Sequence, residues 1–249
     1  MSGSIRYSRQ VTLPGWGKAG QDRLGASSVL IIGMGGLGVP AATYLAAAGA
    51  GSLVINDFDT VDASNLARQP IFDDADIGKL KVTAAAKALE QQNPDCRLTT
   101  MDRRLDAAQL VDAIAASDVT LDCSDNFPTR FAVNAACVQT ATPLVSGAAI
   151  RFEAQLAVFR ADLAPGPCYR CLYDESGVEL EDCQGQGVIS PMVGLIGSAM
   201  ALEAVRIIVG IGKPLHSRVL VYDAATSEWR AIGLRQDPRC PICSDSKQK

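Results

Sequence analysis

Two short cysteine pairs in the C-terminal third constrain the fold more than any other feature of this sequence. They are Cys168-Tyr-Arg-Cys171 and Cys240-Pro-Ile-Cys243. Four thiolates complete the tetrahedral coordination that Zn²⁺ prefers, and a centre closed by four sulfurs has no position left for water or substrate. We therefore predict that these two distant segments meet around a structural zinc ion. Two redox dithiols, or two unrelated buried pairs, are the alternatives.

The bulk composition indicates a compact α/β protein of the cytoplasm. The chain has 249 residues, of which 48% are hydrophobic and 20% charged, which favours one large core over two small ones. A net charge of −4 and the absence of a Lys/Arg run argue against a nucleic-acid partner. The polar, charged N-terminus does not resemble a signal peptide, so the eight cysteines are expected to be reduced thiols.

The longest apolar stretch, from 188 to 212, is interrupted by Pro191, Glu203 and Arg206. It therefore falls short of the roughly 18 uninterrupted apolar residues of a spanning helix. We predict a buried core helix there, and no membrane partner.

Strand-like and helix-like segments alternate over the first 147 residues. Strands are expected at 27–33, 53–59, 97–101, 118–122 and 143–146, and helices at 37–48, 80–92, 106–116 and 127–140. Repeated β-α units predict a doubly wound, Rossmann-like, mostly parallel sheet. Strand-like runs at 153–159, 218–222 and 228–234, with a long helix at 191–209, predict antiparallel strands that continue it. Residues 174–187 have too little apolar content to pack and are expected to form a mobile loop.

A glycine-rich turn follows the first expected strand. Gly33-Met-Gly-Gly-Leu-Gly38 fits G-x-G-x-x-G between a strand and a helix, where backbone N–H groups can face a phosphate. Asp57 stands at the end of the second strand, where a carboxylate can accept both ribose hydroxyls. The motif predicts a nucleotide site. The alternative is that the glycines only make a tight turn and that Asp57 only caps.

Polar residues that follow the other strands distinguish an ATP site from an NAD site. Ser64-Asn-Leu-Ala-Arg68, Lys81 and Asp125-Asn126 place cations, amides and a carboxylate where the strands end. Cations there can neutralise a triphosphate, and Asp125 can hold Mg²⁺, so we predict ATP. An NAD-dependent oxidoreductase is the alternative, but Tyr-x-x-x-Lys is absent and the only histidine, His216, lies near an expected turn. Asp125 could also simply cap the next helix.

These motifs, in this order, resemble the MoeB/ThiF/HesA family, relatives of the ubiquitin-activating enzymes. The resemblance covers nearly the whole chain and rests on Arg6-Tyr-Ser-Arg-Gln10, Gly33 to Gly38, Asp57-Phe-Asp59, Ser64 to Arg68, Asp122-Cys-Ser-Asp-Asn126 and the two cysteine pairs. Ala67 departs from the Gln of many members. The resemblance implies ATP-dependent adenylation of the C-terminal Gly carboxylate of a ubiquitin-like sulfur carrier protein ending in Gly-Gly, with release of pyrophosphate. A carrier-binding relative without turnover is a further alternative.

The resemblance also implies roles for individual residues. Nucleotide would contact Gly35, Gly36, Asp57, Asp59 and Asn126, its phosphates would contact Asn65, Arg68 and Lys81, Asp125 would carry Mg²⁺, and Arg9 would reach the site of the neighbouring subunit in a homodimer. A carboxylate with a pKa of about 3.5 needs no general base at neutral pH. Positioning and cationic stabilisation by Arg9, Arg68, Lys81 and Mg²⁺ on Asp125 would therefore supply the rate.

The remaining expectations concern the second half of the chain. We expect a single domain over residues 1–249, in which 1–147 bind nucleotide and 148–249 bind the carrier and zinc. A separate protein is expected to donate sulfur, in a pathway such as molybdopterin or thiamine synthesis. Cys183 matches a position where ThiF-like members carry a cysteine that can bond the carrier. Its acidic neighbours Glu179, Glu181 and Asp182 disfavour the thiolate, so a catalytic role for Cys183 stays open.

Overall fold

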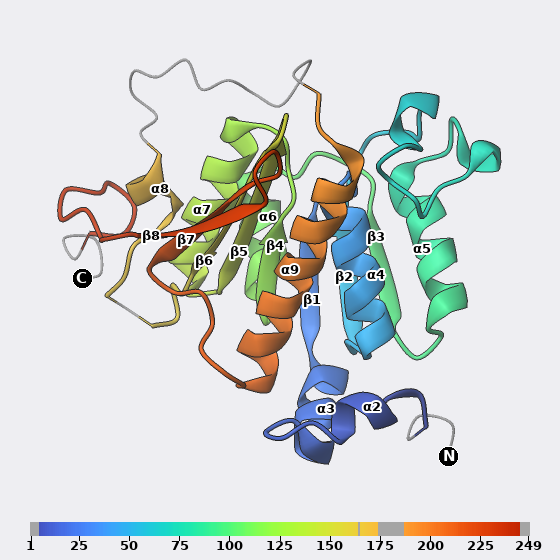
Figure 1. The fold of residues 1–249 in the computed structure, drawn as a ribbon, viewed down its shortest axis with the longest axis horizontal. Coiled ribbons are helices and arrows are strands. Elements are labelled where there is room, and N and C mark those ends of the chain that lie inside the picture. Colours follow the sequence, from blue (N-terminus) through green and yellow to red (C-terminus); the bar gives the residue numbers. More distant parts are fainter. Residues whose placement is uncertain (1–4, 164, 174–186, 245–249) are drawn as a thin grey trace.

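The computed structural model describes residues 5–163, 165–173 and 187–244, which build one eight-stranded sheet (Figure 1). The strand order is β3-β2-β1-β4-β5-β6-β7-β8. Pairing is parallel from β3 to β5 and antiparallel from β5 to β8. This confirms the predicted doubly wound sheet with an antiparallel continuation. The strands are β1 (Ser28–Ile32), β2 (Ser52–Asn56), β3 (Arg97–Met101), β4 (Val119–Asp122), β5 (Leu144–Ile150), β6 (Glu153–Phe159), β7 (Arg218–Asp223) and β8 (Glu228–Gly233).

Two helical layers cover the parallel part of the sheet. Alternate residues of β1 enter different cores: Val29 and Ile31 pack on one face, and Leu30 and Ile32 on the other. The first face is covered by α4 (Gly38–Ala48), α5 (Lys81–Gln92) and α9 (Ser190–Val209), and the second by α6 (Ala107–Ala115) and α7 (Phe127–Thr140). Because both faces are covered, the inner strands read as unbroken apolar runs.

The strand order reverses between β1 and β4, and this places the ligand crevice. The chain leaves β1 toward β2 and β3 on one side, while β4 pairs with β1 on the other. Ile32 and Asp122 are register partners at the carboxyl ends of β1 and β4. Open α/β sheets bind ligands outside the carboxyl ends of the strands at such a reversal. The glycine-rich turn and the Asp122–Asn126 segment both leave the sheet at this point.

Several elements differ from the sequence-based expectation. The chain begins with two unpredicted helices, α2 (Ser8–Val11) and α3 (Gly17–Ala26), and two short 3₁₀ turns follow β2 at Ala63–Asn65 and Asp74–Asp76. β2 ends at Asn56 rather than 59, because the Asp57 side chain accepts hydrogen bonds from the loop backbone instead. β5 continues to Ile150 because its extra residues pair with β6. Of the expected mobile loop, residues 174–186 lie outside the described residues.

The helix α9 is the predicted core helix. Within the described part of the chain it alone has the length and hydropathy of a membrane span, but 56% of its apolar window is buried inside the protein. It packs beside α4 and against β5 and β6. The buried Glu203 carboxylate accepts hydrogen bonds from Arg206 and from the backbone N–H of Leu215. A carboxylate satisfied in this way is compatible with a protein core.

Candidate active site and metal centre

A cleft of about 830 Å³ opens at the carboxyl ends of β1, β2 and β4. Its walls come from segments that are distant in the sequence: the glycine-rich turn, the end of β2, the turn around Asn65, the start of α5 and the β4–α7 connection. All nucleotide-site residues predicted from sequence line it except Arg9; they are Gly35, Gly36, Asp57, Asp59, Asn65, Arg68, Lys81, Asp125 and Asn126. Parallel strands gather these segments because their carboxyl ends share one edge.

The four glycines of the turn serve two purposes. A Cβ on Gly33 would approach Cys123 O to 2.9 Å, and one on Gly38 would overlap Gly33 O, so these two allow the turn to close against β4. A Cβ on Gly35 would meet only Gln69 Nε2, at 3.9 Å, so this glycine leaves open space at the cleft. No side chain caps the N-terminus of α4, so its first N–H groups can face an anion.

Asp57 is held rigidly at the cleft wall. Its Oδ2 accepts a hydrogen bond from Met34 N at 2.7 Å, and its Oδ1 accepts one from Asp59 N at 2.9 Å. Burial raises the pKa of this carboxyl, and the hydrogen bond from Asp59 and the charge of Lys81 oppose that rise. The side chain therefore bridges the glycine-rich turn and the β2 loop. Each oxygen keeps lone-pair capacity for a ribose hydroxyl.

Three further polar side chains, Asn65, Arg68 and Lys81, line the cleft. Lys81, the first residue of α5, is only 7% exposed, and its ammonium lies 3.0 Å from Asp59 Oδ2. Asn65 is buried and its side chain accepts a hydrogen bond from Asp62 N. The Arg68 guanidinium donates to Ser64 O at 2.8 Å. The three predicted residues thus lie together in the cleft, where two cations and an amide could meet an anionic ligand.

The β4–α7 connection carries Asp125. Asn126, not Asp125, caps α7: its Oδ1 accepts a hydrogen bond from Thr129 N at 3.0 Å. The alternative that Asp125 merely caps this helix is therefore wrong. Asp125 is exposed at the cleft and receives only a 3.3 Å contact from the Asn126 amide. An exposed carboxylate in a cleft that also contains Arg68 and Lys81 suits a Mg²⁺ ion, whose preferred ligands are oxygens.

Sequence reasoning missed several residues of the cleft. Arg104 lies over the Phe58 ring at 5.0 Å, and both line the cavity. Gln69 is 2% exposed, and its Oε1 has no hydrogen-bond partner among the described residues. Arg130, on α7, is 4% exposed and donates to Ser124 O at 2.5 Å. A lone Arg on an otherwise apolar helix was the only available signal for Arg130.

Arg9 lies far from the cleft of its own chain. It belongs to α2, whose surroundings are tied to the ends of α4 and α5: Gln10 donates to Ala48 O, and Arg6 donates to Gln92 O. Both helices begin at the cleft and end at the opposite side of the sheet, where Figure 1 shows α2. The structure therefore does not bring Arg9 to the cleft of its own chain, and its predicted role stays a prediction.

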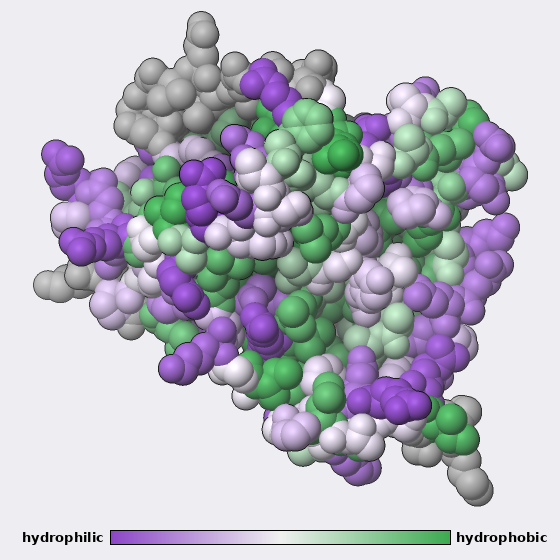
Figure 2. All heavy atoms as spheres, viewed as in Figure 1, coloured by the Kyte–Doolittle hydropathy of each residue, from purple (hydrophilic) through white to green (hydrophobic). Residues whose placement is uncertain are grey.

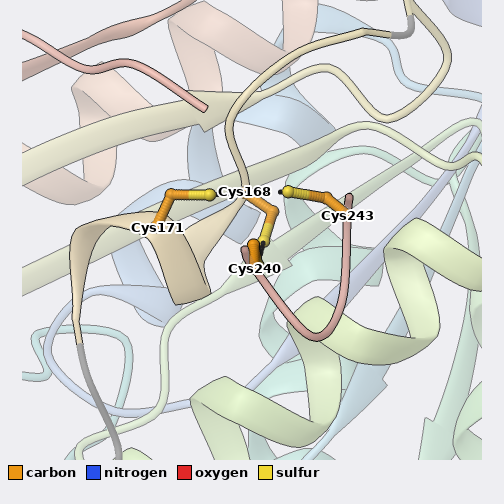
Figure 3. A group of neighbouring side chains, drawn as sticks. All are labelled: Cys168, Cys171, Cys240 and Cys243. Atoms are coloured by element: carbon orange, nitrogen blue, oxygen red, sulfur yellow. Dashed lines mark hydrogen bonds between the residues drawn. The ribbon is translucent and has the colours of Figure 1, made fainter. Parts of the chain in front are cut away.

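The four predicted zinc ligands converge (Figure 3). The sulfurs of Cys168, Cys171, Cys240 and Cys243 all lie within 4.8 Å of one another. Cys168 Sγ and Cys240 Sγ are 3.7 Å apart, and Cys171 Sγ and Cys243 Sγ are 3.4 Å apart. Thiolates about 2.3 Å from a tetrahedral zinc ion stand roughly 3.8 Å apart, so the cluster fits that ion. The two pairs interleave, which two separate redox dithiols would not require.

Amide groups surround this sulfur cluster. Asn134 Nδ2 donates to Cys168 Sγ at 3.6 Å, and Asp237 N donates to Cys171 Sγ at 3.4 Å. Hydrogen bonding from the Cys168 thiol lowers the pKa of Cys171 to about 5, and burial raises that of Cys243 to about 12. A divalent cation would supply the charge that four thiolates need.

The remaining cysteines divide into two groups. Cys96, Cys123 and Cys137 are buried, and burial raises the pKa of all three, to about 11 for Cys96 and about 12 for Cys137. They behave as small apolar side chains, as predicted. Cys183, with its neighbours Glu179, Glu181 and Asp182, lies outside the described residues, so its role stays a prediction.

The fold and the two centres define a nucleotide-binding α/β protein in which a four-cysteine metal site is joined to the antiparallel half. The family model described as "ThiF family" matches residues 7–242. The chain therefore belongs to the ThiF family.

Two relatives from Escherichia coli (strain K12) match the chain over nearly its whole length. One, named molybdopterin-synthase adenylyltransferase, is 45% identical over 96% of both chains. The other, named sulfur carrier protein ThiS adenylyltransferase, is 44% identical over 97% of this chain and 96% of its own. A longer relative from Drosophila virilis, named adenylyltransferase and sulfurtransferase MOCS3, is 43% identical over 96% of this chain and 53% of its own.

Solved structures confirm the fold. The complex of E. coli MccB with MccA-N7isoASN superposes with a TM-score of 0.84 at 21% identity, covering 96% of this chain and 75% of that one. At this identity the similarity concerns architecture alone.

Proposed function

We propose that this protein is an ATP-dependent adenylyltransferase that activates the C-terminal glycine carboxylate of a ubiquitin-like sulfur carrier protein. The observation that carries the proposal is the convergence of Asp57, Arg68, Lys81 and Asp125 on one cleft, in a chain 44–45% identical to proteins named as such adenylyltransferases. An NAD-dependent oxidoreductase is not favoured, because the relatives are named as adenylyltransferases and the cleft combines Arg68 and Lys81 with the exposed carboxylate of Asp125.

The proposed reaction follows from the charges in the cleft. The carrier carboxylate, ionised at neutral pH, forms a bond to the α-phosphorus of ATP, while the bond from that phosphorus to the pyrophosphate oxygen breaks. Negative charge then grows on the leaving pyrophosphate. Lys81 and Arg68, which line the cleft, would neutralise it, and Mg²⁺ held by Asp125 would screen the phosphate oxygens. Asp57 would orient the ribose, and the N-terminus of α4 would receive a phosphate.

The two halves of the chain divide the substrates in this proposal. Residues 1–147 bind nucleotide, and 148–249 bind the carrier within the same domain. The β5–β6 turn exposes Phe152 and β8 exposes Trp229, apolar side chains that a small protein partner could cover. The four-cysteine centre would hold zinc and join the end of the chain to this half. The E. coli relatives, similar in length to this chain, are named only as adenylyltransferases, which supports a separate sulfur donor.

A homodimer would complete the site with Arg9. The helices α4 and α9 lie side by side and expose Tyr44, Leu195 and Leu202, and Figure 2 shows hydrophobic side chains along the line of α9. A two-fold axis perpendicular to these helices would set the partner's helices antiparallel to them. The end of one subunit that carries Arg9 would then face the cleft end of the other.

A product assay tests the proposal. The purified protein, supplied with Mg²⁺, ATP and a panel of small proteins ending in Gly-Gly, should yield a carrier–AMP adduct detectable by mass spectrometry. The same carriers lacking the last glycine serve as the control and should give none. Failure of every intact carrier to gain AMP, together with NAD(H) binding, would overturn the proposal in favour of the oxidoreductase.

A further inference from the structure

A single helix, α7, touches both the nucleotide cleft and the metal centre. Its cap, Asn126, follows Asp125 at the cleft. Arg130 and Asn134, four residues apart and therefore on one face of the helix, both reach the Cys168–Tyr169 dipeptide at the metal centre. The two centres are thus bridged by one rigid element.

The side-chain amide of Asn134 contacts the metal-binding segment, residues 168–171, through both its oxygen and its nitrogen. Its Oδ1 accepts a hydrogen bond from Tyr169 N at 2.8 Å, and its Nδ2 contacts Cys168 Sγ at 3.6 Å. Asn134 is 1% exposed, so neither contact competes with bulk water. A movement of Cys168 on gaining or losing a metal ion would therefore shift Asn134 and with it α7.

Arg130 carries the connection to the cleft. Its guanidinium donates to Ser124 O, the carbonyl directly before Asp125. Its positive charge also acts on the nearby Tyr169 hydroxyl, where it opposes the rise in pKa that burial causes. A further contact joins Nη1 to Ser146 Oγ at 3.5 Å. The Tyr169 ring is fixed edge-on between Phe131 and Phe159. Tyr169 belongs to the Cys168–Cys171 pair, so one guanidinium spans from the metal-binding segment to the Asp125 connection.

Ser124 is also held from its other side. The carboxylate of Asp122, which is fully buried, accepts hydrogen bonds from Ser124 N at 3.0 Å and from Ser124 Oγ at 2.6 Å. The peptide that precedes Asp125 therefore sits between a buried anion and a buried cation. Buried polar networks of this kind restrict the groups they hold to one geometry.

We propose that occupancy of the four-cysteine centre and occupancy of the nucleotide cleft are thermodynamically coupled through α7, with Asn134, Tyr169 and Arg130 as positioning residues. A bound metal fixes the positions of Cys168 and Tyr169. Tyr169 then holds Arg130 against Ser124, and this keeps the β4–α7 connection, which carries Asp125, in the conformation that binds Mg-nucleotide. This proposal rests on the proposed function and adds that the metal also raises the affinity of the cleft for nucleotide.

Equilibrium metal affinity provides a test that does not depend on turnover. Coupling is reciprocal, so nucleotide must tighten metal binding by the factor by which metal tightens nucleotide binding. The zinc dissociation constant of the full chain is measured by chelator competition, with and without a saturating, non-hydrolysable ATP analogue in excess Mg²⁺. We expect about a tenfold decrease with nucleotide, within the usual range of such couplings.

Two matched variants locate the path. Tyr169→Phe removes the hydroxyl that meets Arg130 but keeps the ring contacts, so the protein should fold, bind zinc and lose the nucleotide effect. Tyr173→Phe removes a neighbouring hydroxyl, which donates to Gln155 on β6, and should keep the full effect. Circular dichroism and zinc content verify that both variants are folded and loaded.

The outcomes separate this inference from the proposed function. Nucleotide that binds the loaded protein without changing zinc affinity would overturn the coupling and leave the adenylation proposal intact. If the nucleotide effect on zinc affinity is undiminished in Tyr169→Phe, the proposed path through Tyr169 is wrong. This conclusion also holds if removal of the metal simply unfolds the protein. Loaded protein that binds no Mg-nucleotide would count against both.

Discussion

Lys81 and Asp59 form the most informative pair of charges in the cleft. The ammonium is nearly buried, while the Asp59 side chain is 58% exposed. A buried ammonium without a partner would be costly, and the 3.0 Å ion pair with Asp59 supplies that partner and fixes the position of Lys81. An incoming phosphate can then take over the exposed side of the pair. In the proposed reaction, the pair would present a cation to the leaving pyrophosphate without a large rearrangement.

Replacing Lys81 tests its proposed role. Lys81→Met keeps the length of the side chain and removes its charge, and the stranded Asp59 can turn to water. We expect the single-turnover rate of carrier adenylation to fall by about 10²–10³, the usual cost of one transition-state donor. Lys79→Met is the control, because Lys79 makes only an exposed ion pair with Asp76 and should leave the rate unchanged. Equal loss in both variants would contradict the assignment.

The raised pKa of Asp57 predicts a pH dependence of nucleoside binding. The carboxylate must be ionised to accept two ribose hydroxyls, and burial makes it protonate at a higher pH than an ordinary Asp. Adenosine affinity should therefore fall as the pH is lowered through that raised pKa. Calorimetry with adenosine, which carries no phosphate to titrate, measures this. Asp57→Asn should bind weakly at every pH and lose the acid dependence; an unchanged pH profile in that variant would remove Asp57 from the site.

At the start of helix α7, adjacent residues have different tasks, one in helix stability and one in the proposed chemistry. Its cap and its neighbouring cleft residue are adjacent in sequence but differ in function: Asn126 satisfies the helix terminus, and Asp125 projects to the cavity. Farther along, the same helix uses Arg130 and Asn134 to reach the metal centre. A helix this closely tied at both ends is a suitable support for a metal-binding carboxylate.

Adjacent substitutions at Asp125 and Asn126 should differ in their effect on stability. Asp125→Ala removes the proposed Mg²⁺ ligand but no structural bond, so carrier-dependent pyrophosphate exchange should be abolished with an unchanged melting temperature. Asn126→Ala removes the cap and should cost about 1 kcal/mol of stability, which lowers the melting temperature by several degrees. Thermal melts and exchange assays on both variants decide this. Near-normal exchange in Asp125→Ala would exclude it from the mechanism.

The molecule as a whole is expected to work as a dimer, because its own Arg9 lies at the wrong end of the sheet. In the proposed arrangement each cleft combines Lys81 of one subunit with Arg9 of the other. The apolar face over α4 and α9 would be covered by the second copy. Each subunit alone would then have an incomplete phosphate site.

Mixing two inactive variants tests this sharing. Arg9→Ala and Lys81→Met should each be nearly inactive as homodimers. After subunit exchange, random pairing makes half of the dimers mixed, and each mixed dimer has one intact cleft, so activity should return to about a quarter of the wild-type value. If Arg9 acted within its own chain, both clefts of the mixed dimer would be defective and no activity would return.

Local patterns in the chain were sufficient for most of the elements. The ranges 97–101, 127–140 and 153–159 were predicted with the bounds observed for β3, α7 and β6. Periodicity, Pro and Gly punctuation and the two Cys-x-x-Cys spacings are properties of neighbouring residues, so they are readable without a fold. The short helices α2 and α3 were missed because their apolar periodicity is weak and they pack on elements far along the chain.

The placement of side chains from distant segments could not be read in this way. That Arg130 is buried, that it meets Tyr169 from a cysteine pair, and that Arg9 faces away from its own cleft all depend on strand order and on which helix covers which face. Residue types and spacings report what a segment can bind. Distances between segments arise from packing, in which burial of apolar faces sets the order of the strands and leaves a few polar groups enclosed together.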